Sequence, residues 1–428
     1  MTGWHVSVVG AFDRFNYGDV LFARLAPALL GPRLPEARFA FHGLRRADLS
    51  AEGGVPVRPL SEIYRPDPAR ERREHLVFLA GGALLGPSWS HMAEHVLPPR
   101  TARLAKRAQD RIGRTRTAPL WRRLFGCPNL QPWTVDPLDL PDPAHSHVAY
   151  NAVGGIGLGG LSKAEIDWQR GALSRAAWLT VRDAPTADSV EARGLPRPPV
   201  IPDSAVAMDV LVDEAALEEG RARALALAVD GAGRAGGRAE PYLALQIAER
   251  RMRGQAGAIA ARLREMHAAT GLDVLSFAIG RAPGHEDQIA SERLVAELGD
   301  APWFRVVREP LDVTGIMTLI AGAACYAGTS LHGFITASVF GVPRVGLLDV
   351  PKIEGFRDAW DLAEMPVGTA FEALPGAVAR ALAADPGRMG ARRERTRAAY
   401  LENLDAFCEG LRLSGAPGPA AEELREAV

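Results

Sequence analysis

Short apolar runs recur along the chain, and most of them end in glycine or in a polar residue that opens an amphipathic stretch. Each run has the length of a strand and each following stretch has the period of a helix. The pattern therefore predicts the strand-loop-helix units of a doubly wound α/β fold. The predicted strands are residues 4–9, 75–79, 147–153, 177–181, 241–247, 273–279, 304–307, 325–328 and 344–348.

This alternation is interrupted between Asp209 and Glu240, where an Ala/Glu/Arg helix precedes the glycine-rich stretch DGAGRAGGRAEP. Such a stretch is typical of a tether between domains. Two Rossmann-like halves joined by a linker imply a cleft between them. We predict an N-terminal Rossmann-like domain over residues 1–210 and a linker region over residues 211–240. A C-terminal Rossmann-like domain over residues 241–390 and a surface helix with a frayed tail over residues 391–428 follow.

The predicted strand that ends at Gly328 leads directly into a helical pattern through Gly-Thr-Ser-Leu-His-Gly. Gly328 and Gly333 allow a tight turn, and Thr329 or Ser330 can cap the helix, whose free N–H groups form an anion site. His332 lies in this turn, and imidazole is the side chain that titrates nearest neutral pH. His332 is therefore a candidate for proton transfer. The alternative is that His332 only caps the helix or packs.

Polar residues and glycines also follow the other predicted strands. Because the carboxyl ends of parallel strands meet at one edge of a sheet, these positions should converge on the cleft. Asp19 has two interpretations, as the N-cap of the next helix or as a carboxylate that faces the cleft. The positions expected to line the cleft are Asn16, Gly18, Asp19, Gly81, Gly82, Gly154, Gly155, Arg182, Asp183 and Asp203.

The composition is that of a folded protein, and the net charge of −1 predicts no general attraction to nucleic acid or to anionic membranes. The segment from Arg100 to Arg123 is the exception, since it contains nine basic residues and a single acidic one, Asp110. It would attract an anionic acceptor or the lipid phosphates of a membrane surface, which suggests peripheral association. An ordinary solvated helix face is the other interpretation.

The three cysteines, Cys127, Cys325 and Cys408, are far apart and have no metal-like spacing, so we expect no disulfide framework, no metal site and a cytoplasmic setting. No basic region precedes the first apolar run, and we expect no signal peptide. Residues 313–343 lack charged side chains, but their glycines and hydroxyls favour a buried strand between two helices over a membrane span. The sequence leaves open whether the protein forms a homo-oligomer.

In order, the chain carries Asn-Tyr-Gly-Asp after the first strand, Gly-Gly after the second, a glycine loop after HVAYNAVG, then LTVRD, Pro-Asp, GTSLHGFITASVFGVP and Pro-Lys. Over residues 10–365 this set resembles the polysaccharide pyruvyl transferase family. The resemblance implies two domains like those of B-type glycosyltransferases. It also implies transfer of pyruvate from phosphoenolpyruvate, as donor substrate and without a cofactor, onto two hydroxyls of a sugar as a ketal.

The resemblance also implies roles for named residues. His332 would act as general acid and base, and Asp19 would orient the hydroxyls of the acceptor. Arg182 would hold the carboxylate or phosphate of the donor through two hydrogen bonds. The helix N-terminus at Thr329, Ser330 and Gly333 would supply backbone donors, and Lys352 a second contact to the anion. The expected acceptor is a sugar or a lipid-linked saccharide, and the inner face of the membrane is an alternative location for the protein within the cytoplasm.

One position departs from the family pattern, because several members carry arginine where this chain has Ser330. A missing cation could come from Arg250, Arg251 or Arg253. The departure leaves two alternatives open. The first is a glycosyltransferase or other group transferase that uses a different anionic donor, with His285 near a nucleotide pocket. The second is a non-catalytic binding member of the family.

Overall fold

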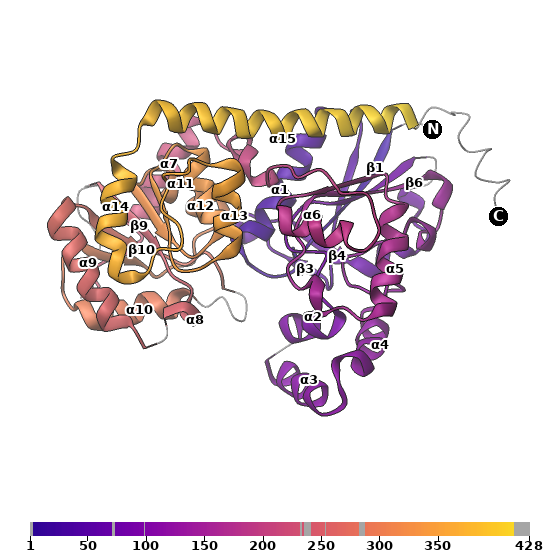
Figure 1. Cartoon of the computed structure of the whole chain (residues 1–428), viewed down its shortest axis with the longest axis horizontal. Helices are drawn as coiled ribbons and strands as arrows, with labels where there is room; N and C mark the ends of the chain where they lie inside the picture. The colour runs from indigo at the N-terminus through magenta and orange to yellow at the C-terminus, as the bar shows by residue number, and fades with distance from the viewer. Residues whose placement is uncertain are drawn as a thin grey trace.

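The computed structural model describes residues 3–70, 73–97, 99–231, 233–234, 241–252, 254–281 and 287–414. They form two α/β domains, each built on its own mainly parallel sheet, with one long helix lying along both (Figure 1). The predicted fold class is confirmed.

The N-terminal sheet has seven strands in the order β3-β4-β2-β1-β5-β6-β7, all parallel except β3, which pairs with β4 in the antiparallel sense. The central strand β1 is buried on both faces, as expected for a parallel sheet covered by helices on both sides. The strands are β1 (Trp4–Val9), β2 (Arg38–Gly43), β3 (Ala47–Asp48), β4 (Pro56–Pro59), β5 (Glu74–Leu79), β6 (Ser146–Val153) and β7 (Trp178–Val181).

The helices of this domain are α1 (Tyr17–Leu30), α2 (Trp89–Val96), α3 (Pro99–Ile112), α4 (Arg114–Phe125), α5 (Lys163–Ser174) and α6 (Ala184–Glu191). Helices α2 to α4 lie between β5 and β6 in sequence, and α3 and α4 project away from the rest of the domain (Figure 1).

The C-terminal sheet has six strands in the order β13-β12-β9-β10-β11-β8, and only β8 is antiparallel to its neighbour. The strands are β8 (Ala228–Val229), β9 (Tyr242–Gln246), β10 (Asp273–Ser276), β11 (Phe304–Val307), β12 (Cys325–Gly328) and β13 (Arg344–Gly346). The helices are α7 (Glu214–Ala226), α8 (Glu249–Met252), α9 (Ala256–Thr270), α10 (Asp287–Leu298), α11 (Val313–Ala321), α12 (Leu331–Val339), α13 (Pro351–Trp360), α14 (Leu374–Leu382) and α15 (Pro386–Ser414).

All nine predicted strands are present, and the buried strand between two helices at residues 313–343 is α11-β12-α12. The residues predicted as a linker region contain α7 and β8, and β8 extends the C-terminal sheet through its pairing with β11. A 3-10 helical segment, η7 (Ser204–Leu211), precedes them.

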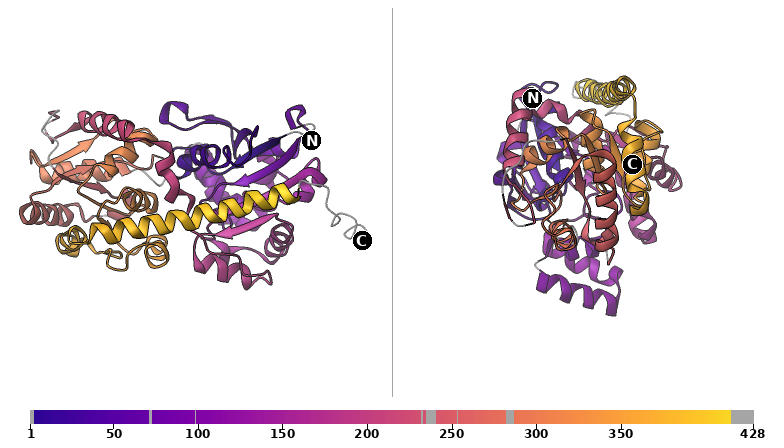
Figure 2. Two further views of the ribbon diagram at one scale, coloured as in Figure 1. Left: turned by 90° about the horizontal axis from the view of Figure 1, so that it is seen from above. Right: turned by 90° about the vertical axis from the view of Figure 1, so that its left-hand side faces the viewer.

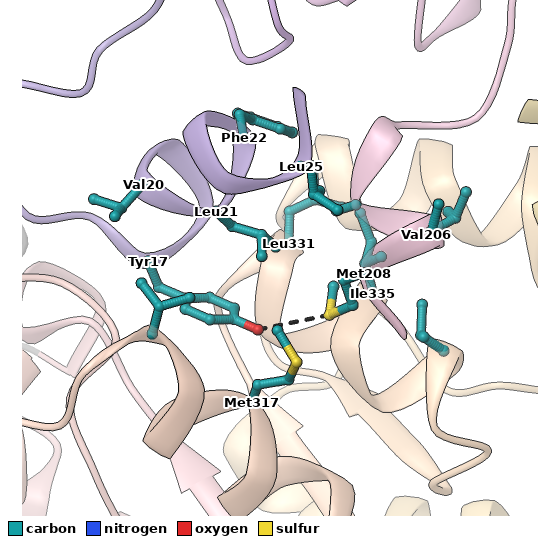
Figure 3. Close-up of a cluster of buried hydrophobic side chains, with 14 of the residues drawn as sticks. Tyr17, Val20, Leu21, Phe22, Leu25, Val206, Met208, Met317, Leu331 and Ile335 are labelled. Atoms are coloured by element: carbon teal, nitrogen blue, oxygen red, sulfur yellow. Dashed lines mark hydrogen bonds between the residues drawn. The ribbon is translucent and has the colours of Figure 1, made fainter. Parts of the chain in front are cut away.

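A buried hydrophobic cluster joins the domains where α1 and α12 both pack on η7 (Figure 3). At its centre the Tyr17 hydroxyl lies 2.9 Å from Thr336 Oγ1 and donates to Met208 Sδ at 3.7 Å. Leu331 and Ile335 of α12 pack beside them. The N-termini of α1 and α12, one from each domain, are thereby held next to each other.

Helix α15 begins in the C-terminal domain and runs across the N-terminal one (Figure 2). Its Phe407 ring packs against Phe78 and Trp178, and the Tyr400 hydroxyl accepts a hydrogen bond from Asn151 Nδ2 at 3.1 Å. One face of this predicted surface helix is therefore buried in the core.

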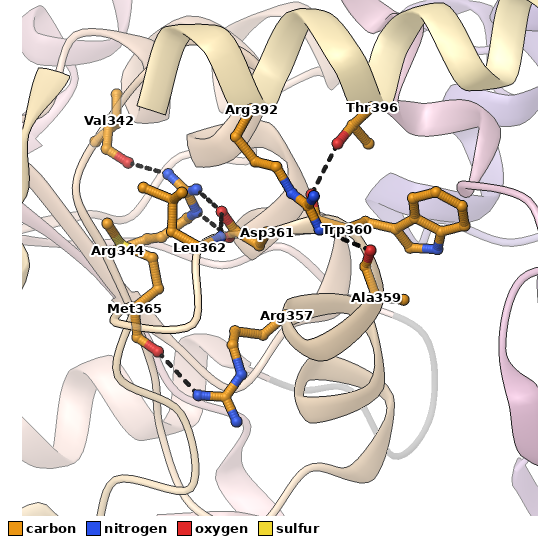
Figure 4. A network of polar contacts seen from close by, with 10 residues as sticks. All are labelled: Val342, Arg344, Arg357, Ala359, Trp360, Asp361, Leu362, Met365, Arg392 and Thr396. Atoms are coloured by element: carbon orange, nitrogen blue, oxygen red, sulfur yellow. Dashed lines mark hydrogen bonds and ion pairs between the residues drawn. The ribbon is translucent and has the colours of Figure 1, made fainter. Parts of the chain in front are cut away.

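Helix α13, which carries Lys352, is fixed from two sides (Figure 4). At its C-terminal end, the buried Arg344 guanidinium of β13 forms two hydrogen bonds with the Asp361 carboxylate, one of them 2.6 Å long. From α15, Arg392 donates to the Ala359 carbonyl and Thr396 to the Trp360 carbonyl.

Candidate active site

A cavity of about 260 Å³ opens between the domains at the carboxyl ends of both sheets. Segments that follow β1, β5 and β7 meet segments that follow β9, β12 and β13. Its polar lining comprises Arg14, Asn16, Asp19, His91, His95, Arg182, Gln246, Arg250, Asp287, Thr329, Ser330, His332 and Lys352.

The N-terminus of α12 forms one wall of the cavity. Ser330 is the N-cap, and its hydroxyl accepts the Gly333 backbone N–H at 3.3 Å. The Thr329 backbone N–H donates to Gln246 Oε1 at 3.1 Å, and the Thr329 hydroxyl accepts the Ala248 N–H at 3.0 Å. The turn between strand and helix is thus fixed by β9, and Thr329 and Ser330 at the helix N-terminus line the cavity.

His332 lies in the first turn of α12 and is mostly buried. Its imidazole packs directly on the Gly18 backbone of the other domain, where a Cβ atom would overlap Nδ1, and its ring meets Phe22 edge-on. Nε2 is buried without a hydrogen-bond partner, 3.8 Å from Asp203 Oδ2. Glycine is thus required at position 18 by the close approach of a side chain from the second domain.

Asp203 lies behind His332 and is almost inaccessible to solvent. Its Oδ2 accepts a hydrogen bond from Arg182 Nη1 at 2.8 Å, and its Oδ1 accepts the Ala205 N–H at 3.0 Å. Burial alone would raise the pKa of Asp203, but the neighbouring His332 and the charge of Arg182 hold it well below its ordinary value. The carboxylate is therefore ionised and can stabilise a positive charge on His332.

Asp19 is not the N-cap of α1, because that position is held by Asn16. Instead, its carboxylate lines the cavity beside Gly82, whose positive φ of 91° allows the chain to turn there. Burial raises the pKa of Asp19, and the surrounding cations, Arg14 first, oppose that shift. Of the two interpretations of Asp19, a carboxylate that faces the cleft is the one that fits the structure.

Four cationic side chains line the cavity: Arg14, Arg182, Arg250 and Lys352. Arg14 and Arg182 have carboxylate partners, whereas among the described residues no ion pair involves Arg250 or Lys352. Burial lowers the pKa of Lys352 to about 8, and the charge of Arg182 acts in the same direction. Such a concentration of positive charge suits a small ligand with several negative charges.

None of the helices in the described part of the chain combines the length and the apolar character needed to cross a membrane. Among the same residues, no group of three or more His, Cys, Asp or Glu side chains could hold a metal ion.

Solved structures of UDP-GlcNAc 2-epimerases share this architecture. That of Methanocaldococcus jannaschii is 12% identical with a TM-score of 0.51, and the match covers 92% of this chain and 98% of that one. The Neisseria meningitidis enzyme bound to UDP-GlcNAc is 10% identical with a TM-score of 0.51, over 97% and 100% of the two chains. This likeness shows the fold, which is that of the B-type glycosyltransferases. No curated protein matches the chain.

The model of the polysaccharide pyruvyl transferase family matches residues 155–348. This match covers somewhat less than half of the chain. The resemblance seen in the sequence is confirmed, and with it the expectation of a transferase. The match with the pyruvyl transferases includes Arg182, Asp203, Arg250 and His332, whereas Asp19 and Lys352 lie outside it.

Not every residue expected in the cleft reaches the cavity. Asp183 caps α6, since its Oδ1 accepts the Thr186 backbone N–H at 2.8 Å. The glycines support the site from behind; Gly154, for example, packs on the Arg182 guanidinium. His285 and Arg253 lie outside the described residues. The predicted positions that do not line the cavity are Gly18, Gly81, Gly154, Gly155, Asp183, Asp203 and Gly333.

Several cavity residues were not among the residues predicted for a pyruvyl transfer site. Asp287 Oδ2 accepts hydrogen bonds from Gln246 Nε2 and from the Ile279 and Gly280 backbone N–H groups, at 2.9 to 3.1 Å. Burial nevertheless raises the pKa of Asp287 to about 6. The only signal for Gln246 in the sequence was a polar residue at the end of a buried apolar strand.

Proposed function

We propose that the protein transfers pyruvate from phosphoenolpyruvate to two hydroxyls of a sugar or lipid-linked saccharide and forms a cyclic ketal. The observation that carries the proposal is a cavity with four cationic side chains beside His332 and Asp19, within a chain whose residues 155–348 match the pyruvyl transferase family. Phosphoenolpyruvate carries a carboxylate and a phosphate, which require cations at two ends of a small site.

Arg250 supplies the cation that Ser330 does not, because it lines the same cavity as the N-terminus of α12. Its neighbour Arg251 instead donates to the Asp349 carbonyl at 3.2 Å. In this proposal Arg182 and Lys352 bind the carboxylate and Arg250 and the helix N-terminus bind the phosphate, so that the methylene carbon faces His332.

The reaction needs one proton at the methylene carbon, two new bonds from acceptor oxygens to C2, and loss of phosphate. In our proposal His332 takes the proton of the first hydroxyl and delivers it to the methylene carbon while that oxygen bonds to C2. The second hydroxyl then bonds to C2, phosphate leaves with the electrons of its C–O bond, and the second proton leaves with it. Asp19 hydrogen-bonds the hydroxyls and holds them near C2.

We place this reaction in the cytoplasm, a setting in which free thiols such as those of the three buried cysteines persist.

Release of inorganic phosphate from phosphoenolpyruvate, measured across a panel of saccharide acceptors, tests the proposed function. We expect release that depends on the acceptor. A nucleotide diphosphate that raises the melting temperature, together with no phosphate release for any acceptor, would favour glycosyl transfer and contradict the proposal.

Substitution of Arg250 by alanine should weaken phosphoenolpyruvate binding by roughly 10- to 100-fold, because a hydrogen bond to a charged group contributes about 1.5–3 kcal/mol. The matched control is Arg251→Ala, which changes the adjacent arginine that bonds to a backbone carbonyl. Titration calorimetry should show Arg251→Ala within about twofold of the parent. Equal losses in both variants would exclude a specific contact of Arg250 with the donor.

Donor binding should also weaken as the pH rises through about 8, where Lys352 loses its proton. The sign follows from the charge, since only the protonated amine attracts the anion. In Lys352→Arg the affinity should stay constant across this range, whereas Lys352→Met should bind weakly at every pH. An unchanged pH dependence in Lys352→Met would mean that another group titrates.

A further inference from the structure

Helices α3 and α4 project together from the N-terminal domain, downward in Figure 1 and in the right-hand view of Figure 2. They are not loosely attached, because α2 holds both of them. Gln109 Nε2 of α3 donates to the Ser90 carbonyl at 3.1 Å, the Ser90 and Thr117 hydroxyls lie 3.0 Å apart, and Phe125 of α4 stacks on Trp89. The projection is therefore a fixed part of the domain.

The outer surface of this pair carries large apolar side chains that nothing in the described chain covers. Leu104, Leu120 and Leu124 are 60 to 63% exposed, and Ile112 is 50% exposed. Leu120 and Leu124 are one turn apart on α4, and Leu104 and Ile112 are two turns apart on α3, so each helix presents a stripe of apolar side chains.

Basic side chains flank these stripes. Arg103, Arg107 and Arg111 follow one another at helical spacing on α3 next to Leu104, and Arg116 and Arg123 lie beside the leucines of α4. Asp110 is the one acidic residue in the two helices, while the remainder of the chain contains more acidic than basic residues. The positive charge of the protein is therefore concentrated here.

A depression of about 650 Å³ lies between α4 and the body of the domain, and its cations are Arg65, Arg122 and Arg123. Asp139 is the one carboxylate among its lining residues. Its wall includes Tyr64, whose buried hydroxyl has no hydrogen-bond partner within the described structure. Three guanidinium groups at one depression suit an anionic headgroup.

We propose that α3 and α4 dock the protein on an anionic lipid bilayer, with the leucines among the acyl chains and the arginines among the headgroups. Exposed leucines interleaved with arginines on rigid helices are the pattern of interfacial membrane binding, whereas a nucleic-acid surface would not need the leucines. This inference goes beyond the proposed function and does not depend on it.

Docking there would bring the bilayer close to the cavity. Ala118 of α4 lines a hollow together with His91 and Ile156, and both of those residues also line the cavity. The side of α4 that faces the domain therefore borders a hollow that shares two lining residues with the cavity.

Sedimentation of the full chain with phosphatidylcholine vesicles, with and without phosphatidylglycerol, tests this proposal. We expect the protein to sediment only with vesicles that contain phosphatidylglycerol, and we expect high salt to release the protein from them. Arg116→Gln with Arg123→Gln should weaken binding roughly 30-fold, since each basic residue near an anionic surface contributes about fivefold. Leu120→Ser with Leu124→Ser should weaken it on the order of tenfold.

The matched control is Arg380→Gln with Leu382→Ser on α14, a pair of the same residue types on the C-terminal domain, which should bind like the parent. All variants change exposed side chains, and unchanged melting temperatures would verify their folding. Equal binding to vesicles without phosphatidylglycerol, or binding by both α4 variants at parental strength, would overturn the proposal. Binding to duplex DNA without binding to vesicles would overturn it as well.

Discussion

Replacement of His332 by glutamine should lower turnover by about 10²- to 10⁴-fold, the usual contribution of a general acid or base, and leave donor affinity nearly unchanged. Glutamine fills similar space and can hydrogen-bond, but it cannot carry the proton from hydroxyl to methylene. The structure favours this residue because its imidazole lines the cavity between Gly18 and the ionised Asp203. Arg182 and Arg250 should still bind the donor.

Steady-state phosphate release and calorimetric titration with phosphoenolpyruvate separate these two effects. His145→Gln is the control, because His145 pairs with Glu74 at the opposite, amino-terminal end of the sheet and should not affect turnover. A His332→Gln variant with full activity would show that His332 only packs at the domain interface. An inactive variant that no longer binds the donor would assign it to binding and not to proton transfer.

Replacement of Arg344 by methionine should lower the free energy of unfolding by about 3–5 kcal/mol, because it leaves the Asp361 carboxylate buried without its partner. Both side chains are almost completely buried, and the guanidinium also donates to the Val342 carbonyl at 2.9 Å. Since Asp361 ends the helix that carries Lys352, donor affinity should fall together with stability.

Urea unfolding of this variant is best compared with Arg388→Met, which breaks the exposed pair with Glu364 and should cost no more than about 1 kcal/mol. The double variant Arg344→Met with Asp361→Leu should recover much of the loss, because no unpaired charge remains. A loss for Arg344→Met no larger than that for Arg388→Met would contradict the importance of the buried pair.

Much of the fold could be predicted because the buried parallel strands are continuous apolar runs that end in glycine or polar residues, as at β1, β5 and β12. Strand β2 was missed because it begins with the exposed Arg38 and alternates in burial. Strand β8 has two residues and exists only through its pairing with β11. The buried face of α15 could not be predicted either, since its partners, Phe78 and Trp178, lie far away in the sequence.

The site was partly predictable for the same reason. Side chains directly after strands, such as Arg182 and His332, converge because parallel strands end at one edge. The role of Gly18 was not predictable, because it depends on a histidine from the other domain. The sequence could not predict whether Arg250 or Arg251 lines the cavity, because this depends on which of the two side chains bonds to the Asp349 carbonyl.

The most direct test of the account is the mass of the acceptor after incubation with the protein and phosphoenolpyruvate. Pyruvyl transfer predicts an acceptor whose mass has increased by that of pyruvic acid less one water. This product should form together with one phosphate and should be absent with His332→Gln. An acceptor that gains a sugar from a nucleotide donor, or one that stays unmodified across a broad saccharide panel while the protein binds phosphoenolpyruvate, would contradict it.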